Sequence, residues 1–129
     1  MSSEVKDDLR YTKDHEWARV DDGEITIGIT AHAVEQLGDI TLVNLDVGAG
    51  DSLESGKEFG TVESVKTLAD LFSPVKGRVT RINDKLEDAP ELVNDDCYGE
   101  GWMISIEADR AALDELMEAA AYRALLESL

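Results

Sequence analysis

Two runs of alternating apolar and polar residues stand near the start of the chain. Residues 16–20, EWARV, alternate moderately, and residues 24–30, EITIGIT, alternate clearly, with an Asp-Asp-Gly turn sequence between them. Two alternating runs around Asp-Gly are typical of a β-hairpin. Because side chains alternate sides along a strand, Ile25, Ile27 and Ile29 are expected on one face of the second strand.

A short helix is expected directly after this hairpin. Residues 30–39 read TAHAVEQLGD, with Thr30 in the position of a helix N-cap and Gly38 just beyond a helix C-terminus. The interval between these two residues has room for about two helical turns.

Further strands are expected along the rest of the chain. They fall at residues 40–48, 58–64, 77–84 and 102–107. Simple alternation places Ile40 and Leu42 on one face of the first of these strands and Val43 on the other. It likewise places Phe59 and Val62 on opposite faces of the second. Residues 85–101 read as an irregular connection.

The apolar period becomes helical after Asp109, which is a suitable N-cap. This pattern predicts an amphipathic helix over about residues 110–127 that packs on the sheets. Many short strands with turn signals predict a mostly β fold with short helices, either a sandwich or a small barrel. A chain of 129 residues is expected to form one domain over residues 1–129, with Lys66 at a hairpin tip.

The charge balance limits the partners of the chain. The apolar fraction of 43% is that of a globular protein, but 29 acidic residues stand against 12 basic ones, a formal net charge of −17. Such a surface repels nucleic acid and anionic membranes. This excess of negative charge either keeps the protein soluble or adapts it to high salt, where ions screen the repulsion among its own charges. We expect a halophilic source. The polar N-terminus and the lack of a membrane-length apolar run lead us to expect a cytoplasmic protein.

Few residues suggest autonomous catalysis. His15, His32 and Cys97 do not form a metal-ligand spacing, and the single cysteine allows no intramolecular disulfide. The sequence has neither a phosphate-binding glycine loop nor a nucleophile elbow. Carboxylates occur throughout the chain, so their presence carries no catalytic information. These observations argue against an enzyme and give no candidate metal site.

Lys66 stands between two strand-like runs in a chain that is poor in lysine. An exposed lysine is ordinarily a solubilising charge. A lysine at a tight turn is also well presented to a modifying enzyme, because its amine is nucleophilic once deprotonated.

The residues around Lys66 resemble the lipoyl-attachment region of the glycine cleavage system H protein family. The family pattern has Glu-Ser-Val-Lys, an aspartate four residues after the lysine, and a nearby Pro-Val/Ile-x-Gly. Here these places hold Glu63, Ser64, Val65, Lys66, Asp70, Pro74, Val75 and Gly77. The resemblance continues through YTKDHEWARV (11–20), TIGITAHAVEQLGDI (26–40), PELVNDDCYGEGWM (90–103) and ALDELMEAAAYRALLE (112–127). The chain departs from the family at Cys97, where a proline is usual, and at Thr67 and Leu68, where small residues are common.

This resemblance implies a carrier rather than an enzyme. It implies a lipoyl-domain-like sandwich and barrel hybrid with an N-terminal segment and a C-terminal helix, and lipoate attached covalently to Lys66. The implied partners are glycine decarboxylase (P protein), a tetrahydrofolate-dependent aminomethyltransferase (T protein) and dihydrolipoyl dehydrogenase (L protein). A lipoate ligase or lipoyltransferase is implied as the modifying enzyme. An acidic carrier is expected to meet basic patches on such partners.

Three carboxylates are candidate site residues by the same resemblance. Glu16 and Asp70 are candidates for a cleft that receives the cationic amine of the loaded arm, since a carboxylate pairs with an amine. Glu63 is a candidate for recognition by the ligase. Each also has a plainer interpretation: Glu16 as a strand-surface charge, Asp70 as a turn cap and Glu63 as a solubilising charge.

Four alternatives to a glycine cleavage carrier can be compared with the sequence. A biotinyl domain usually has methionine on both sides of the lysine, whereas Val65 and Thr67 stand here. A bare lipoyl domain lacks the extra N-terminal segment and C-terminal helix. A protein that relays lipoyl groups to other enzymes, and a binding module without lipoate, are both compatible with the sequence.

Overall fold

The computed structural model describes residues 4–21 and 23–129, and its described strands form two antiparallel sheets. The larger sheet has the strand order β1-β2-β3-β9-β8-β5 and the smaller one β4-β6-β7. The strands of the larger sheet, in that order, are Arg10–Tyr11, Glu16–Asp21, Glu24–Ile29, Ile104–Glu107, Gly77–Ile82 and Ser52–Leu53. Those of the smaller sheet are Ile40–Leu45, Glu58–Ser64 and Leu68–Phe72.

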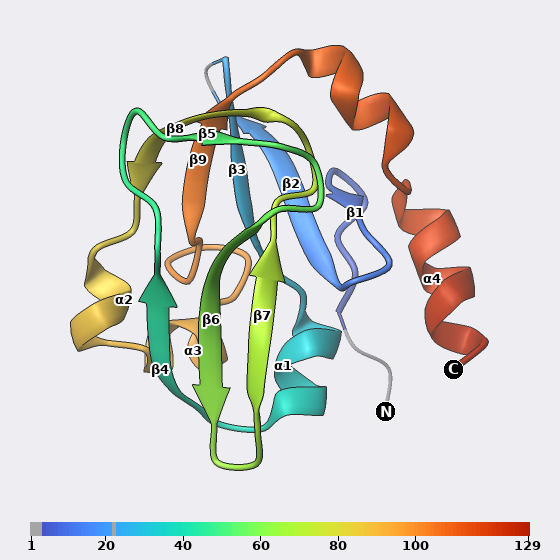
Figure 1. Cartoon of the computed structure of the whole chain (residues 1–129). Helices are drawn as coiled ribbons and strands as arrows, with labels where there is room; N and C mark the ends of the chain where they lie inside the picture. Colours follow the sequence, from blue (N-terminus) through green and yellow to red (C-terminus); the bar gives the residue numbers. More distant parts are fainter. Residues whose placement is uncertain (1–3, 22) are drawn as a thin grey trace.

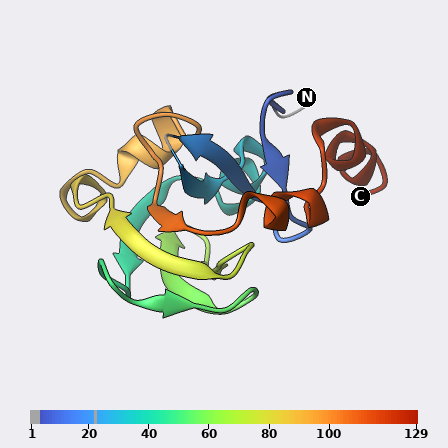
Figure 2. The ribbon, with the colours of Figure 1, turned by 90° about the horizontal axis from the view of Figure 1, so that it is seen from above.

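The two sheets pack face to face around one apolar core. Figure 1 shows β4, β6 and β7 in front of the larger sheet, and Figure 2 shows the same layers from above. Ile25, Ile27 and Ile104 of the larger sheet share a buried cluster with Val62 and Leu71 of the smaller one. The described strands of the two sheets form no common ladder, so the fold is a sandwich without barrel closure. The prediction of a mostly β fold with short helices is confirmed.

The first hairpin and the first helix agree with the sequence pattern. Strands β2 and β3 pair from Glu16 opposite Ile29 to Asp21 opposite Glu24, while residue 22 of the turn lies outside the described residues. Helix α1 (Ala31–Leu37) begins after Thr30, whose hydroxyl oxygen accepts a hydrogen bond from the Ala33 N–H at 3.2 Å. It ends at Gly38, which has φ 83°.

Two β-bulges make the predicted strand faces wrong. In β4 the register shifts between Ile40 and Leu42, so that Ile40 and Val43 are both buried while Leu42 is 44% exposed. In β6 a shift near the start of the strand leaves Phe59 and Val62 both in the core. An extra residue in one strand reverses the face of every residue beyond it, and strict alternation does not anticipate that reversal.

Residues 85–101 are more ordered than expected. They contain α2 (Lys85–Asp88) and α3 (Glu91–Asp95), which bury Leu86 and Val93 respectively. The Asn94 side chain bonds both the N–H and the C=O of Ile40, at 2.9 and 3.1 Å. These contacts fix the start of β4 against the two short helices. The short strand β5 is likewise absent from the strands expected from the sequence.

The C-terminal segment is not one continuous helix over about residues 110–127. It forms a 3₁₀ helix, η1 (Arg110–Glu115), and then α4 (Ala119–Glu127). Between them Met117 exchanges two backbone hydrogen bonds with Tyr11, at 2.8 and 2.9 Å. The predicted cap at Asp109 is confirmed, because its carboxylate accepts from the Ala111 N–H. Across residues 4–21 and 23–129, no helix combines the length and apolar character needed to cross a membrane.

Candidate functional site

Lys66 lies in the turn that joins β6 to β7, at the bottom of Figure 1. Glu63 and Leu68 form the last strand pair before this turn, and the Ser64 N–H donates to the Thr67 carbonyl at 2.8 Å. The Ser64 hydroxyl oxygen accepts from the N–H groups of both Lys66 and Thr67, each at 3.1 Å. Ser64 therefore fixes the backbone under Lys66 while the lysine side chain stays exposed.

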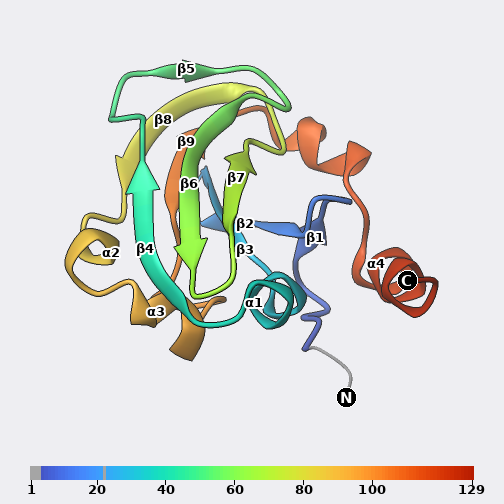
Figure 3. The same ribbon diagram turned by 60° about the horizontal axis from the view of Figure 1, so that its bottom comes forward.

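The connection between α1 and β4 supports the same turn. The Val65 N–H donates to the Asp39 carbonyl at 3.1 Å. The side chain of Lys66 passes over Gly38, since a Cβ added to Gly38 would lie 3.1 Å from Lys66 Cε and 3.7 Å from Val65 Cγ2. Figure 3 shows α1 and this connection beside the turn. The base of the lysine is thus held from two sides.

The amine of Lys66 is open to a modifying group. Within residues 4–21 and 23–129, it has no hydrogen bond or ion pair. Other lysines of the chain do form ion pairs with carboxylates, among them Lys6, Lys76 and Lys85. An exposed and unpaired amine on a fixed backbone fits the covalent attachment of an acyl group.

Glu16 is a buried carboxylate rather than the strand-surface charge considered above. It is 2% exposed. Its Oε2 accepts from the Phe72 N–H and its Oε1 from the Thr12 hydroxyl, both at 3.0 Å. Burial raises the pKa of Glu16 from 4.5 to about 7, and the two hydrogen bonds oppose that rise. The side chain therefore links β2 to the end of β7 and titrates near neutral pH.

The structure does not bring Glu16 to the lysine. Phe72 pairs with Glu58 at the end of the hairpin that is opposite the turn. Phe72 lies four residues beyond Leu68, which corresponds to about 13 Å along an extended strand. Glu16 is thus separated from Lys66 by the length of β7.

Glu63 and Asp70 lie close to the turn on the outside of the smaller sheet. Glu63 pairs with Leu42 on one side and with Leu68 on the other, and Asp70 pairs with Thr61. Both acidic residues are exposed. Asp70 stands in the middle of β7, so it does not cap a turn. The side chains of both are without ion pairs or hydrogen bonds in the described part of the chain.

A polar cluster next to Glu16 was not foreseen from the sequence. His15 has φ 67°, and its Nδ1 lies 2.8 Å from the Tyr122 hydroxyl. That hydroxyl lies 2.8 Å from the Thr30 hydroxyl, and the rings of His15 and His32 are 4.5 Å apart. Burial lowers the pKa of His15, and the His32 ring adds to this effect. The cluster joins α4, the start of α1 and the segment before β2.

The departure at Cys97 leaves its loop well anchored. The Cys97 carbonyl accepts from the Trp17 indole N–H at 3.0 Å. Burial raises the pKa of the thiol to about 12, so Cys97 behaves as a small packing residue.

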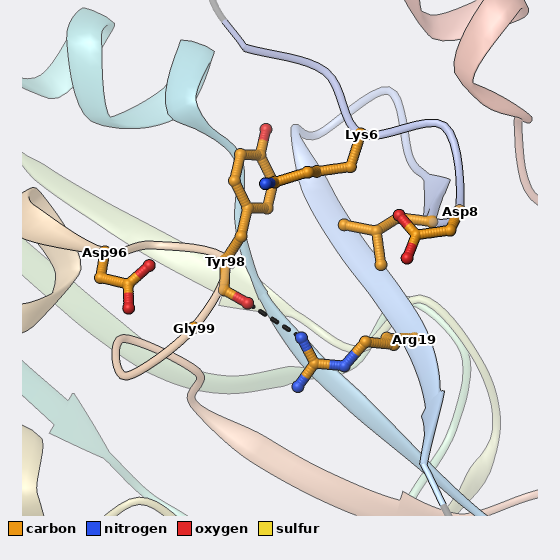
Figure 4. Close-up of a pocket in the computed structure, with 7 residues that line it drawn as sticks. Lys6, Asp8, Arg19, Asp96, Tyr98 and Gly99 are labelled. Atoms are coloured by element: carbon orange, nitrogen blue, oxygen red, sulfur yellow. Dashed lines mark hydrogen bonds between the residues drawn. The ribbon is translucent and has the colours of Figure 1, made fainter.

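A pocket of about 260 Å³ lies away from the residues that surround Lys66. It is lined by Lys6, Asp8, Leu9, Arg19, Asp96, Tyr98 and Gly99. Figure 4 shows these side chains and the hydrogen bond from Arg19 to the Tyr98 carbonyl, which measures 2.9 Å. The lysine at the turn is thus displayed on the surface rather than set in this pocket.

Comparisons with known proteins agree on one family. The family model described as "Glycine cleavage H-protein" matches residues 9–129. The glycine cleavage system H protein of Anaeromyxobacter sp. (strain K) is 50% identical over 125 residues, covering 96% of this chain and 97% of the relative. The probable glycine cleavage system H protein of Natronomonas pharaonis is 48% identical over 124 residues, covering 96% and 98%.

A solved structure extends this similarity to three dimensions. The crystal structure of a glycine cleavage system H protein from Mycobacterium marinum has a TM-score of 0.86 and 36% identity, and the match covers 97% of this chain and 100% of that one. The chain therefore belongs to the glycine cleavage H-protein family and is a carrier component of the glycine cleavage system, not itself a catalyst.

Proposed function

We propose that Lys66 carries lipoate in an amide bond at its Nζ atom. The observation that carries this proposal is the unpaired amine of Lys66 on a turn whose backbone is bound by Ser64 and Asp39. The Glu-Ser-Val-Lys sequence of the turn and membership of the family support the same assignment. When bound, lipoate supplies a disulfide, which accepts both electrons and a one-carbon unit that bears an amine.

The chain carries the aminomethyl group from glycine decarboxylase to the aminomethyltransferase, and the dithiol to dihydrolipoyl dehydrogenase. These three enzymes and the enzyme that attaches lipoate are the proposed partners. The chain's own contribution is mechanical and electrostatic. Ser64, Gly38 and Asp39 hold the root of the arm, so that only the part beyond the turn is free to move between partners.

Glu16 is the proposed partner of the cationic amine on the loaded arm. The support is a carboxylate that is buried yet has a pKa near neutral, at the end of β7 away from the turn. An amine that approaches it forms a charge-assisted hydrogen bond in a site that excludes water. Asp70, two residues from Phe72 along β7, is proposed to assist from the exposed side. Equal rates of hydrolysis for loaded wild type and loaded Glu16→Gln would refute this role.

The working environment is proposed to be a cytoplasm of high salt. The formal net charge of −17 supports this, because screening by molar salt suppresses repulsion among surface carboxylates. Under such conditions long-range steering toward partners is weak, and shape and apolar contacts carry more of the recognition.

The test of the proposed function is reconstitution with purified partner enzymes. Lipoylated wild type is expected to support the exchange of glycine carboxyl carbon with bicarbonate, catalysed by glycine decarboxylase. Lys66→Arg is expected to abolish it, and Lys57→Arg, which changes an exposed lysine before β6, is expected to leave it intact. If the loaded chain donates lipoyl groups to other proteins but fails in the exchange, the relay alternative replaces this proposal.

A further inference from the structure

A pocket on the side of the larger sheet that faces away from the smaller one is lined by charges of both signs. Ala18 of β2 lies in the core between the sheets, so its neighbour Arg19 points to the opposite side. The pocket of about 260 Å³ lies there, and its charged lining consists of Lys6, Arg19, Asp8 and Asp96. Two cations and two carboxylates give this lining a formal net charge of zero, whereas the whole chain carries −17.

Arg19 is held in place and still has donors to spare. Its Nε donates to Asp21 and its Nη1 to the Tyr98 carbonyl, both at 2.9 Å, and its guanidinium lies 5.1 Å from the centroid of the Trp17 ring. Its Nη2 has no hydrogen bond within residues 4–21 and 23–129. A guanidinium that is already fixed loses little conformational freedom when it binds a carboxylate.

Asp8 and Asp96 stand on opposite sides of the pocket, with the two cations between them (Figure 4). Asp8 has no hydrogen bond or ion pair in the described part of the chain. Asp96 accepts from the Glu100 N–H at 3.0 Å and has no ion pair in that same part. A Cβ at Gly99 would collide with the Asp96 carboxylate, so the glycine makes room for it. Both carboxylates therefore keep acceptor capacity for an ammonium group.

An apolar wall adjoins these charges. Leu9 and the Tyr98 ring form it, and the two residues are 4% and 7% exposed. The Tyr98 hydroxyl donates to the Glu4 carbonyl at 2.6 Å and accepts from the Ala31 N–H at 3.1 Å, which fixes the ring. The Nζ atom of Lys6 lies 5.8 Å from the ring centroid. A ligand with one short apolar group therefore finds a fixed hydrophobic surface next to the charges.

The charges decide the class of ligand. A simple anion meets Asp8 and Asp96 and is repelled by the field of the whole chain, and a simple cation meets Lys6 and Arg19. A zwitterion satisfies both pairs, with its carboxylate on the guanidinium and its ammonium group on a carboxylate. The volume is below the range of about 300–1,000 Å³ that is typical of pockets for drug-sized ligands, so it suits a molecule the size of one amino acid.

We propose that this pocket binds a free α-amino acid with a short aliphatic side chain. The carboxylate of the ligand lies against Arg19, its ammonium group against Asp8 or Asp96, and its side chain on the apolar wall. Bound in this way, it joins the N-terminal segment to β2 and to the loop after α3, so occupancy stabilises the fold. The stability of the carrier then follows the concentration of free amino acid. The site is independent of the proposed modification of Lys66.

The test compares compounds of one shape by NMR titration of the isotope-labelled, unmodified chain, at the lowest salt concentration at which circular dichroism shows it folded. Leucine carries both charges, leucinamide lacks the carboxylate, and isocaproate lacks the ammonium group. Leucine is expected to shift the amide resonances of Tyr98 and Gly99 until they saturate, with a Kd of about 1–10 mM. Leucinamide and isocaproate are each expected to bind about tenfold more weakly. Glycine, which has no side chain for the apolar wall, is also expected to bind more weakly than leucine.

Charge variants give a readout that damage to the fold cannot imitate. Asp8→Asn combined with Asp96→Asn leaves a cationic pocket, so it is expected to bind leucine about tenfold more weakly and isocaproate severalfold more tightly than wild type does. Arg19→Gln is expected to shift the preference the other way, toward leucinamide. Matched controls are Asp88→Asn and Arg110→Gln, which change an exposed aspartate and an exposed arginine elsewhere and are expected to behave as wild type.

Stability provides a second measurement of the same binding. Leucine at about ten times its Kd is expected to raise the melting temperature of wild type by a few degrees and to leave that of the double aspartate variant unchanged. The proposal would be overturned by the absence of saturation with leucine up to about 100 mM, tenfold above the weakest affinity expected. Equal binding of leucine, leucinamide and isocaproate, or equal leucine affinity in wild type and the double variant, would overturn it as well. None of these results bears on Lys66, because the unmodified chain is used throughout.

Discussion

The buried carboxylate of Glu16 makes the stability of this fold depend on pH in a defined direction. Its pKa is about 7 in the folded chain and 4.5 as the ordinary value, so the folded state binds the proton more tightly. At about 1.4 kcal/mol per pKa unit, the difference is worth about 3 kcal/mol. This contribution is fully present below pH 4.5 and is lost as the pH rises through about 7.

Glu16→Gln isolates this effect, because glutamine has the same shape and does not ionise. Its carbonyl oxygen can still accept from the Phe72 N–H and its amide can donate to the Thr12 hydroxyl oxygen. The free energy of unfolding of wild type, minus that of the variant, is therefore expected to fall by about 3 kcal/mol between pH 4 and pH 8. Subtraction removes the titration of the surface carboxylates, which both proteins share.

Urea denaturation at fixed molar salt, at half-unit steps of pH, measures this difference. Thr12→Val provides an internal check, since it removes a hydrogen bond that lowers the pKa of Glu16. The step in stability is then expected to move to higher pH. A difference curve that is flat from pH 4 to pH 8, or one that rises with pH, would refute the reasoning.

Three other predictions follow from contacts and charge. Gly38→Ala and Gly56→Ala replace glycines at φ 83° and 84°, and each is expected to lower the free energy of unfolding by about 1–2 kcal/mol. Only Gly38→Ala is expected to move the Cε resonance of Lys66, because only Gly38 touches that side chain. Equal changes of this resonance in both variants would contradict the contact between the Lys66 side chain and Gly38. Tyr122→Phe leaves the Thr30 hydroxyl and His15 Nδ1 without their shared hydrogen-bond partner. Urea denaturation is expected to show a free energy of unfolding that is lower by about 1–3 kcal/mol. A decrease below about 0.5 kcal/mol would count against that network. Transfer from molar to dilute salt is expected to unfold the chain, as followed by circular dichroism, and an unchanged melting temperature would argue against salt adaptation.

Local signals predicted those parts of the fold that local interactions determine. The hairpin of β2 and β3, the Thr30 cap and the turn at Lys66 all depend on neighbouring residues, and each is found where the pattern placed it. The bulges of β4 and β6 depend on pairing between strands, so alternation within one strand misses them. The C-terminal helix is interrupted because the Met117 backbone pairs with Tyr11, a contact that spans the chain.

The candidate site likewise combines features that local sequence predicts with features that depend on contacts between distant residues. The position of Glu63 and Lys66 at the tip of a hairpin, with Asp70 farther along its second strand, follows from the spacing of these residues in the sequence. The burial of Glu16 and its bond to Phe72 link residues 56 positions apart, and no local pattern carries them. The passage of the Lys66 side chain over Gly38 likewise depends on how α1 meets the smaller sheet.

The most direct test of the central claim is the intact mass of the chain purified from its native cells, followed by peptide mapping across Lys66. The account predicts a mass increase of one lipoyl group, confined to the peptide that contains Lys66. An unmodified Lys66, in cells whose other lipoyl proteins are fully modified, would contradict it.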